Sequence, residues 1–197
     1  FRNELKITKQ NFVLSYLGAL GTWYMLDEML DFFKVLLNEK PNSIFLFITP
    51  EDKNQVIQKA GEKNIPSDKL SFIRANRNDV PTLLSLSDAS IFFIKPVFSK
   101  RASSPTKQGE IMSMGIPVIC NSMIGDTDQI VEESGAGIVI KNFDDKHYLE
   151  AIKKFETIKN FNPEKLRAAA KKYFSLEKGI ESYFKVYENA LGNDNKQ

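Results

Sequence analysis

The chain has 197 residues, with 27 Lys and Arg against 25 Asp and Glu, so its formal net charge is +2. This length is typical of one domain, and the near balance of charge argues against a protein that binds nucleic acid by neutralising phosphates. The single cysteine, Cys120, excludes a disulfide framework, and the single histidine, His147, excludes a metal site with several histidine ligands. No apolar run reaches the roughly 18–20 residues that cross a bilayer, so no transmembrane segment is predicted.

Short apolar runs alternate with segments of helical periodicity up to about residue 140. The run IFLFI at 44–48 is apolar at every position, which is typical of a strand covered on both faces, as in parallel sheets. Gly, Pro, Asn and Ser punctuate the boundaries between the runs. Strands are predicted at residues 11–17, 44–48, 70–73, 90–94, 117–120 and 136–140.

Helices are predicted between these strands at residues 25–37, 50–63, 79–86, 107–114 and 128–134, and after them at 144–158 and, as one or two helices, at 163–191. The alternation predicts an α/β fold: a Rossmann-like, doubly wound parallel sheet of about six strands with helices on both faces. Residues 1–191 form one predicted domain, and 192–197 are expected to fray. In the last helix one apolar stripe comprises Leu176, Ile180, Tyr183, Phe184, Tyr187 and Leu191.

A glycine turn separates the first predicted strand from the first predicted helix. Gly18, Gly21 and Thr22 would let a ligand approach the backbone there, since ligands bind doubly wound sheets at the carboxyl ends of the strands. The spacing lacks the third glycine of G-x-G-x-x-G, which disfavours NAD and FAD, and no P-loop motif is present. Trp23 and Tyr24 either line the mouth of this cleft or pack as the first helical residues. A tight turn without any ligand remains an equal alternative.

The segment from 103 to 119 carries the most information. Ser104 before Pro105 predicts a helix cap with proline in the first turn, whose free N–H groups, with Thr106 and Lys107, would form a phosphate seat. Glu110, three residues after Lys107, is placed to accept hydrogen bonds from the hydroxyls of a ribose. The alternative is that Lys107 and Glu110 form a surface ion pair worth under about 1 kcal/mol.

Taken together, these motifs resemble the C-terminal, donor-binding half of a GT-B glycosyltransferase of family 4, or group 1. Glu110 followed by Gly115-Ile116-Pro117-Val118-Ile119 matches the family signature E-x-x-x-x-G-x-P-V-v. The other similar segments, in order along the chain, are 15–21, 86–91, 125–132 and 135–140. The resemblance covers residues 11–191.

The resemblance implies a retaining transferase of the hexosyltransferase type that uses a nucleotide-sugar donor, such as a UDP- or GDP-sugar, without a metal. Glu110 would hold the ribose, and the seat around Thr106 and Lys107 would lie at the diphosphate. A similar S-x-P-x-K-x-x-E segment occurs in capsule and O-antigen transferases of this family, which implies polysaccharide biosynthesis.

Two positions depart from the family pattern. Its E-x7-E motif has an earlier glutamate, at the donor sugar, where this chain has Ala102. Its usual Arg and Lys near the first glycine turn are also missing. Lys107, with Arg101 as a second candidate, would supply the missing positive charge at the diphosphate. No catalytic residue is assigned.

A GT-B enzyme has two such domains, and this chain would supply one. The chain starts at Phe1, without an initiator methionine, so we expect it to be a piece of a longer protein. The other half would bind a glycan or lipid-linked sugar acceptor, in the cytoplasm, with peripheral attachment at the inner membrane face. This chain alone would bind a nucleotide weakly and transfer no sugar.

Three other functions remain open from the sequence. Half of a sugar-nucleotide 2-epimerase has the same fold, but the single histidine disfavours it. A non-catalytic nucleotide-binding or assembly module would explain Ala102 as a mark of lost activity. A flavodoxin-like receiver domain is weaker still, because no acidic cluster follows the first strand.

Overall fold

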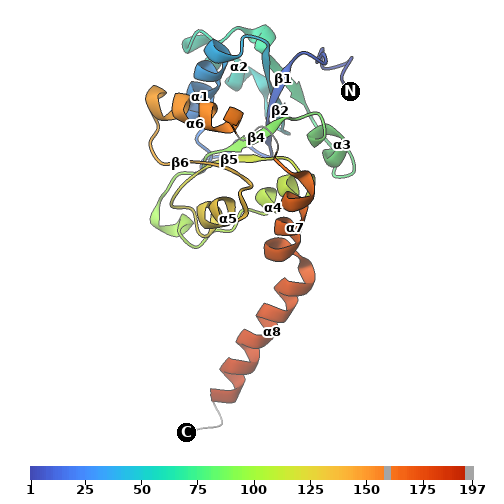
Figure 1. Ribbon diagram of the computed structural model, residues 1–197, viewed down its shortest axis with the longest axis vertical. Coiled ribbons are helices and arrows are strands. Elements are labelled where there is room, and N and C mark those ends of the chain that lie inside the picture. The colour runs from blue at the N-terminus through green and yellow to red at the C-terminus, as the bar shows by residue number, and fades with distance from the viewer. Residues whose placement is uncertain (158–160, 194–197) are drawn as a thin grey trace.

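A parallel sheet of six strands forms the centre of the molecule (Figure 1). The computed structural model describes residues 1–157 and 161–193. The strands lie in the order β3-β2-β1-β4-β5-β6, so the predicted doubly wound α/β fold is confirmed. Their bounds are β1 Phe12–Leu17, β2 Ser43–Ile48, β3 Leu70–Ile73, β4 Ala89–Phe92, β5 Val118–Asn121 and β6 Gly137–Ile140.

The burial of β1 and β2 accounts for the apolar runs at residues 11–17 and 44–48. Every residue of β2 is buried, and β1 is buried from Val13 onward, because helices cover both faces. Val13 pairs with Ile44 and Tyr16 with Phe47 along a register that runs the length of both strands. β1 also pairs with β4, so the strand order reverses between them, and this is the point at which such sheets bind ligands.

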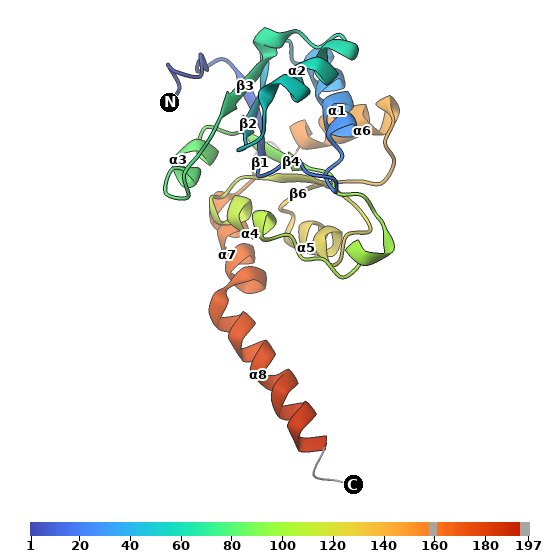
Figure 2. The same ribbon diagram turned by 180° about the vertical axis from the view of Figure 1, so that it is seen from behind.

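Helices cover the two faces of the sheet in separate groups. α1, α2 and α6 lie on one face, and α4, α5 and α7 lie on the other (Figure 2). The bounds of the helices are α1 Leu26–Glu39, α2 Lys53–Glu62, α3 Val80–Leu84, α4 Thr106–Ser113, α5 Thr127–Ser134, α6 Asp145–Thr157, α7 Pro163–Phe174 and α8 Leu176–Asn193.

One predicted helix start and one predicted helix cap are wrong. α2 begins at Lys53, because the Asp52 side chain caps it by accepting the Asn54 amide at 3.0 Å, so residues 50–52 lie outside the helix. α4 begins at Thr106 with Pro105 itself at the N-cap, and no side chain caps it. The extended backbone of Pro105 leaves Ser104 outside the helix, which is why the predicted serine cap does not form.

α7 fixes the position of α4 through a close helix contact. A Cβ atom added at Gly109 of α4 would lie 2.6 Å from Cγ of Phe174, at the end of α7. One added at Gly115, just after α4, would lie 2.7 Å from Cβ of Pro163, at the start of α7. Glycines therefore bring the two helices together at both ends of the contact.

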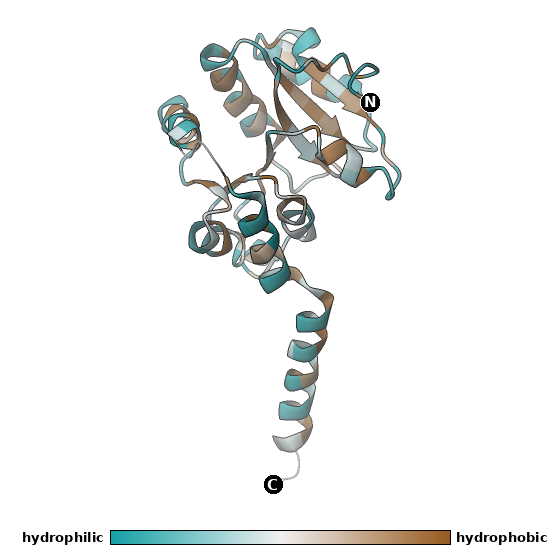
Figure 3. Ribbon diagram, turned by 45° about the vertical axis from the view of Figure 1, so that its right-hand side comes forward, coloured by the Kyte–Doolittle hydropathy of each residue, from teal (hydrophilic) through white to brown (hydrophobic). Residues whose placement is uncertain are grey.

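α8 extends away from the rest of the molecule (Figure 1). The predicted stripe is helical, yet its side chains are exposed rather than packed, with Leu176 and Tyr183 exposed by 75% and 70%. Apolar residues line one side of the helix and polar residues the other (Figure 3). The helix reaches Asn193, two residues into the predicted tail, and residues 194–197 lie outside the described residues. Within the described part of the chain, no helix is long and apolar enough to span a membrane.

Replacing Gly109 by Ala is expected to lower the free energy of unfolding by about 1–3 kcal/mol, because the added methyl overlaps the Phe174 ring. Gly61→Ala in α2 is the matched control: nothing lies within 4 Å of a Cβ there, so it should stabilise the protein by about 0.5 kcal/mol. Chemical denaturation of both variants measures the difference. Equal effects at the two glycines would contradict the proposed α4–α7 contact.

Candidate functional site

The glycine turn lies at the switch point of the sheet. It follows β1, and its first amide, of Gly18, donates a hydrogen bond to the carbonyl of Ile48 at the end of β2. Gly18 has φ +111°, a backbone conformation that L side chains rarely adopt. The turn thus holds its backbone at the carboxyl ends of the strands, as the sequence predicted.

Lys107 of α4 reaches across to this turn. Its side chain is only 9% exposed, and Nζ donates a hydrogen bond to the Tyr16 hydroxyl at 3.3 Å. Nζ also lies 3.7 Å from the ring centroid of Tyr24 and 4.5 Å from that of Tyr16. A Cβ atom at Gly18 would come within 3.1 Å of Nζ, so the absence of a side chain at Gly18 leaves room for the amine.

Burial changes the protonation of Lys107. Loss of water around the amine lowers its pKa to about 7, and the negative charge of Glu110 opposes the shift. The same burial raises the pKa of the Tyr16 and Tyr24 hydroxyls, which therefore stay neutral. Near neutral pH the amine is partly protonated, and an anion placed beside it would raise its pKa, so that the amine takes up a proton.

A hollow of about 340 Å³ opens beside the Lys107 side chain. Its volume lies in the range of small-molecule sites. The residues that line it include Trp23, Tyr24, Lys100, Ser104, Thr106 and Lys107. Of the two alternatives left open for Trp23 and Tyr24, the structure supports the first: both line this hollow, and α1 begins only at Leu26. Since the amides of Thr106 and Lys107 have no acceptor among the described residues, the start of α4 presents two free N–H groups here.

Glu110 lies on another side of α4. Its Oε1 is 2.7 Å from Nη2 of Arg77, which belongs to the loop between β3 and α3. The Glu110 side chain is 30% exposed and that of Arg77 84% exposed, so the carboxylate is reachable from solvent. It lines a second hollow, of about 410 Å³, between α4 and α7, and Thr106 borders both hollows. The alternative ion pair of Lys107 with Glu110 does not form in the structure.

The remaining predicted residues lie at the margin. Gly21 and Thr22 are exposed in the turn, where the Gly21 carbonyl accepts the Tyr24 amide. Arg101 is exposed just after a short 3-10 helix at Phe98–Lys100, and it does not line the hollow. Tyr16 was missed as a site residue, because a buried aromatic at the penultimate position of a strand looks like core.

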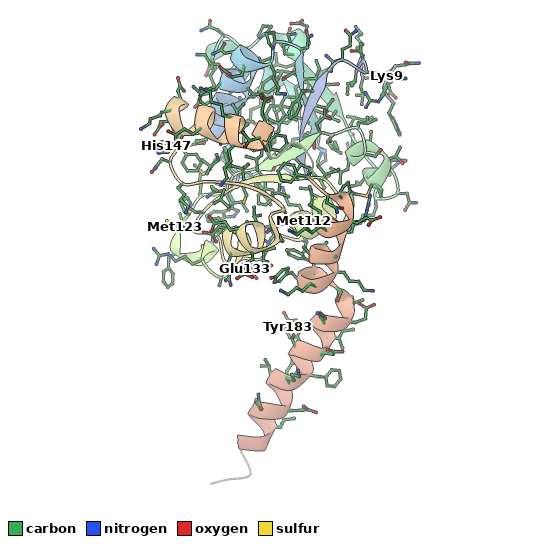
Figure 4. All side chains as sticks on the ribbon, viewed as in Figure 1. Lys9, Met112, Met123, Glu133, His147 and Tyr183 are labelled. Atoms are coloured by element: carbon green, nitrogen blue, oxygen red, sulfur yellow. The ribbon has the colours of Figure 1, made fainter. Side chains whose placement is uncertain are left out.

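Two further side chains that can carry chemistry, Cys120 and His147, do not form a site in the described part of the chain. Cys120 is fully buried, and burial raises the pKa of its thiol. His147, at the start of α6 (Figure 4), contacts the Asp144 carboxylate at 2.8 Å. No group of three His, Cys, Asp or Glu side chains in the described ranges could hold a metal ion.

A larger hollow of about 580 Å³ lies at the opposite, amino-terminal edge of the sheet, lined by Phe12, Asp88 and Ile116 among others. It is bordered by the ion pair of Lys40 with Glu156 and by Phe161, next to residues 158–160 that the structure does not describe. Because ligands of doubly wound sheets bind at the other edge, the smaller hollow at Lys107 is the better candidate.

A doubly wound sheet with a glycine turn, a helix N-terminus and a buried lysine at its switch point is an α/β fold whose features at this edge suit an anionic ligand. The family model described as glycosyl transferases group 1 matches residues 1–173. The chain belongs to this family. A comparison with curated protein sequences found no match.

Several solved structures with the same fold are named as glycosyltransferases, at low sequence identity. WaaG, a glycosyltransferase involved in lipopolysaccharide biosynthesis, superposes with a TM-score of 0.67 at 18% identity over 87% of this chain and 45% of its own. Sucrose-phosphate synthase from Thermosynechococcus elongatus gives 0.74 at 14% identity over 98% and 48%. The chain therefore spans about half of these proteins.

A third structure covers one domain alone. The C-terminal domain of the group 1 family protein LpcC from Francisella tularensis gives a TM-score of 0.63 at 14% identity, over 84% of this chain and 87% of that one. The fold is therefore that of the C-terminal domain of a GT-B glycosyltransferase, as the motifs predicted.

Replacing Lys107 by Met is expected to stabilise the unliganded protein at pH 6 by about 1–2 kcal/mol, because a buried charge is removed at constant bulk. The folded-state pKa of about 7 lies below the unfolded value, so the unfolded chain binds more protons, and this lysine makes stability rise as pH rises from about 7 toward 10.5. That part of the rise should vanish in the variant. Thermal denaturation across this pH range tests it, with exposed Lys53→Met as the control.

Proposed function

We propose that this chain is the donor-binding half of a retaining glycosyltransferase that moves a hexose from a nucleotide diphosphate sugar to a glycan or lipid-linked acceptor. The observation that carries the proposal is the placement of Lys107 and Glu110 on either side of Thr106 at the carboxyl edge of the sheet. Family membership supports sugar transfer in general. The S-x-P-x-K-x-x-E segment favours a capsule, O-antigen or exopolysaccharide product.

In the proposed complex the diphosphate occupies the hollow beside Lys107. The free amides of Thr106 and Lys107 and the Lys107 ammonium face it, so charge-assisted hydrogen bonds would hold it. Lys100, which lies over the Trp23 ring at 4.7 Å and lines the same hollow, adds a second cation. In this proposal Lys100 takes the role that was predicted for Arg101.

Glu110 receives the ribose hydroxyls in this proposal. Its carboxylate accepts hydrogen bonds only, and in the free protein Arg77 occupies one of its oxygens. An ion pair with so exposed a partner contributes little free energy, so the nucleotide can displace it at low cost.

Sugar transfer requires the glycosidic carbon–oxygen bond of the donor to break, with its electron pair leaving on the diphosphate. The Lys107 ammonium and the α4 amides stabilise that negative charge as it develops. The acceptor hydroxyl forms the new bond to the same carbon, and its proton passes to an oxygen of the leaving diphosphate. We propose that no metal takes part.

Coverage of about half the length of WaaG supports a second half that carries the acceptor site. The exposed apolar stripe on α8 is a surface that such a half could cover. Alone, the chain is then expected to bind donor but to transfer no sugar. Action in the cytoplasm, with peripheral membrane contact through that half, is part of this proposal.

A second candidate is a non-catalytic nucleotide-binding or assembly module. Ala102 favours it, because the family's first glutamate is missing there and the side chain is exposed. An epimerase half has less support, since the single histidine, on α6, pairs with Asp144 just before that helix. Sugar transfer by the whole protein, both with the native Ala102 and after Ala102→Glu, would favour the transferase over the module.

Glu110→Ala is expected to weaken binding of UDP or GDP by about tenfold, because charge-assisted hydrogen bonds to the ribose are lost. Isothermal titration of the folded chain measures it, and deoxyribose nucleotides should show a smaller loss than ribose nucleotides. Glu150→Ala on α6 is the matched control and should bind as the native protein does. Unchanged affinity of Glu110→Ala would remove the ribose role.

Lys107→Ala is expected to weaken binding of the diphosphate more than of the nucleoside. We expect a loss of about tenfold or more for UDP or GDP, and little change for uridine or guanosine, because the lysine contacts only the phosphates. Lys154→Ala, on α6 away from the hollow, is the control. Full affinity of Lys107→Ala for the diphosphate would contradict the proposed seat.

A further inference from the structure

Lys107 is held by two tyrosines from other parts of the chain. We propose that Tyr16 and Tyr24 are positioning residues, which clamp the Lys107 amine at the Gly18 turn so that a cation delivered from α4 serves the donor diphosphate in place of one on the turn itself. This inference rests on the proposed function, and it adds two residues that the family motifs do not contain.

The clamp has contacts on three sides of the amine. The Tyr24 ring lies 3.7 Å from Nζ and the Tyr16 ring 4.5 Å, both within the range of cation–π attraction. The two rings meet edge to face at 5.8 Å, so each supports the other. On the third side, Gly18 leaves space that a methyl group would take.

The Tyr16 hydroxyl joins the amine to the turn. It donates a hydrogen bond to the Ala19 carbonyl at 2.6 Å and accepts one from Lys107 at 3.3 Å. The backbone of the turn and the lysine therefore share one anchor. A free lysine side chain would lose rotamer entropy when it binds a ligand, and the clamp removes that cost in advance.

These contacts leave hydrogen-bond donors of the Lys107 ammonium unused. An ammonium has three N–H donors, and Tyr16 accepts one of them, with no further acceptor for Nζ among the described residues. No carboxylate pairs with it in the described chain, since Glu110 pairs with Arg77. A buried amine with aromatic walls and no counter-ion attracts an anion strongly, and the adjoining hollow is the open side.

The clamp couples anion binding to protonation. Titratable or charged groups around the amine are Tyr16 and Tyr24 on its walls, Glu110 on its own helix and Lys100 across the hollow, with Glu51 acting on Tyr16. Of these, the tyrosines stay neutral, and burial keeps the pKa of Lys107 near 7. A bound diphosphate raises that pKa, so the amine takes up a proton from solvent as the ligand binds.

Lysine side-chain carbon-13 NMR on the unliganded chain tests the clamp without any nucleotide. Lys107→Met assigns the signal, which should titrate near pH 7 in the native protein. Tyr24→Ala admits water and should move the titration at least one pH unit upward, Tyr24→Phe should leave it in place, and Tyr16→Phe, which removes the hydroxyl acceptor, should move it downward. A native titration near pH 10, or one that neither tyrosine change moves, would overturn the clamp.

Binding of UDP-glucose and GDP-mannose across pH 6 to 8 tests the role in donor binding. Both phosphates of these probes are esterified, so the ligand keeps its charge over this range. In the native protein, affinity for the probe that binds should fall about tenfold from pH 6 to 8, as the free amine loses its proton. In Tyr24→Ala the fall should shrink below about twofold, with affinity at pH 6 lower by about fivefold.

The outcomes separate the two proposals. A variant that is merely damaged loses affinity equally at every pH, and this result, or a Tyr24→Phe profile like that of Tyr24→Ala, would overturn the clamp while the proposed function stands. A clamp seen by NMR in a native protein that binds neither probe supports the clamp and overturns the donor-binding function. Flattened pH dependence in Tyr24→Ala, restored in Tyr24→Phe, supports both.

Discussion

The burial of the Lys107 amine at the end of β1 is the interaction on which the arrangement of this site depends. A charged group in such a place loses its water, so two aromatic rings and one hydroxyl replace the lost hydration. The missing side chain at Gly18 leaves the room that the amine needs. The amine reaches them only if α4 stays at a set distance from β1. The contact of Gly109 with Phe174 provides this, because it packs α7 against the outer side of α4. A helix beyond the site therefore helps to determine its chemistry.

α4 distributes its functional groups in two directions. Lys107 turns inward to the glycine turn, while Glu110, less than one helical turn later, faces the loop after β3 and pairs with Arg77. Thr106 lies between the two hollows. This geometry suits an extended ligand whose anionic part and hydroxyl-bearing part lie side by side across the start of one helix. Burial of the Lys107 amine costs free energy, and the ion pair of Glu110 with Arg77 contributes little free energy. A ligand that carries phosphate and ribose would therefore give both Lys107 and Glu110 stronger partners.

α8 differs from the other helices in what its apolar side contacts. The stripe that begins at Leu176 has the spacing of a core-facing helix, but it extends beyond the sheet and stays exposed. Large contiguous apolar surfaces of this kind mark interaction sites more often than free surface. The stripe is the surface that the proposed second half would cover.

Apolar runs and helical periodicity were enough to predict the order of strands and helices along the chain, because these signals are local and each segment carries its own pattern. The sequence also indicated the family, through Glu110 and the segment 115–119, and it picked out Lys107, Thr106 and the turn at Gly18. The three-dimensional fold was needed to show that Lys107 is buried against Tyr16 and Tyr24, that Glu110 pairs with Arg77, and that the stripe on α8 is uncovered. Each of these depends on residues far apart in the chain, and their meeting follows from how α4, β1 and the loop after β3 converge at the switch point of the sheet, which no local pattern records.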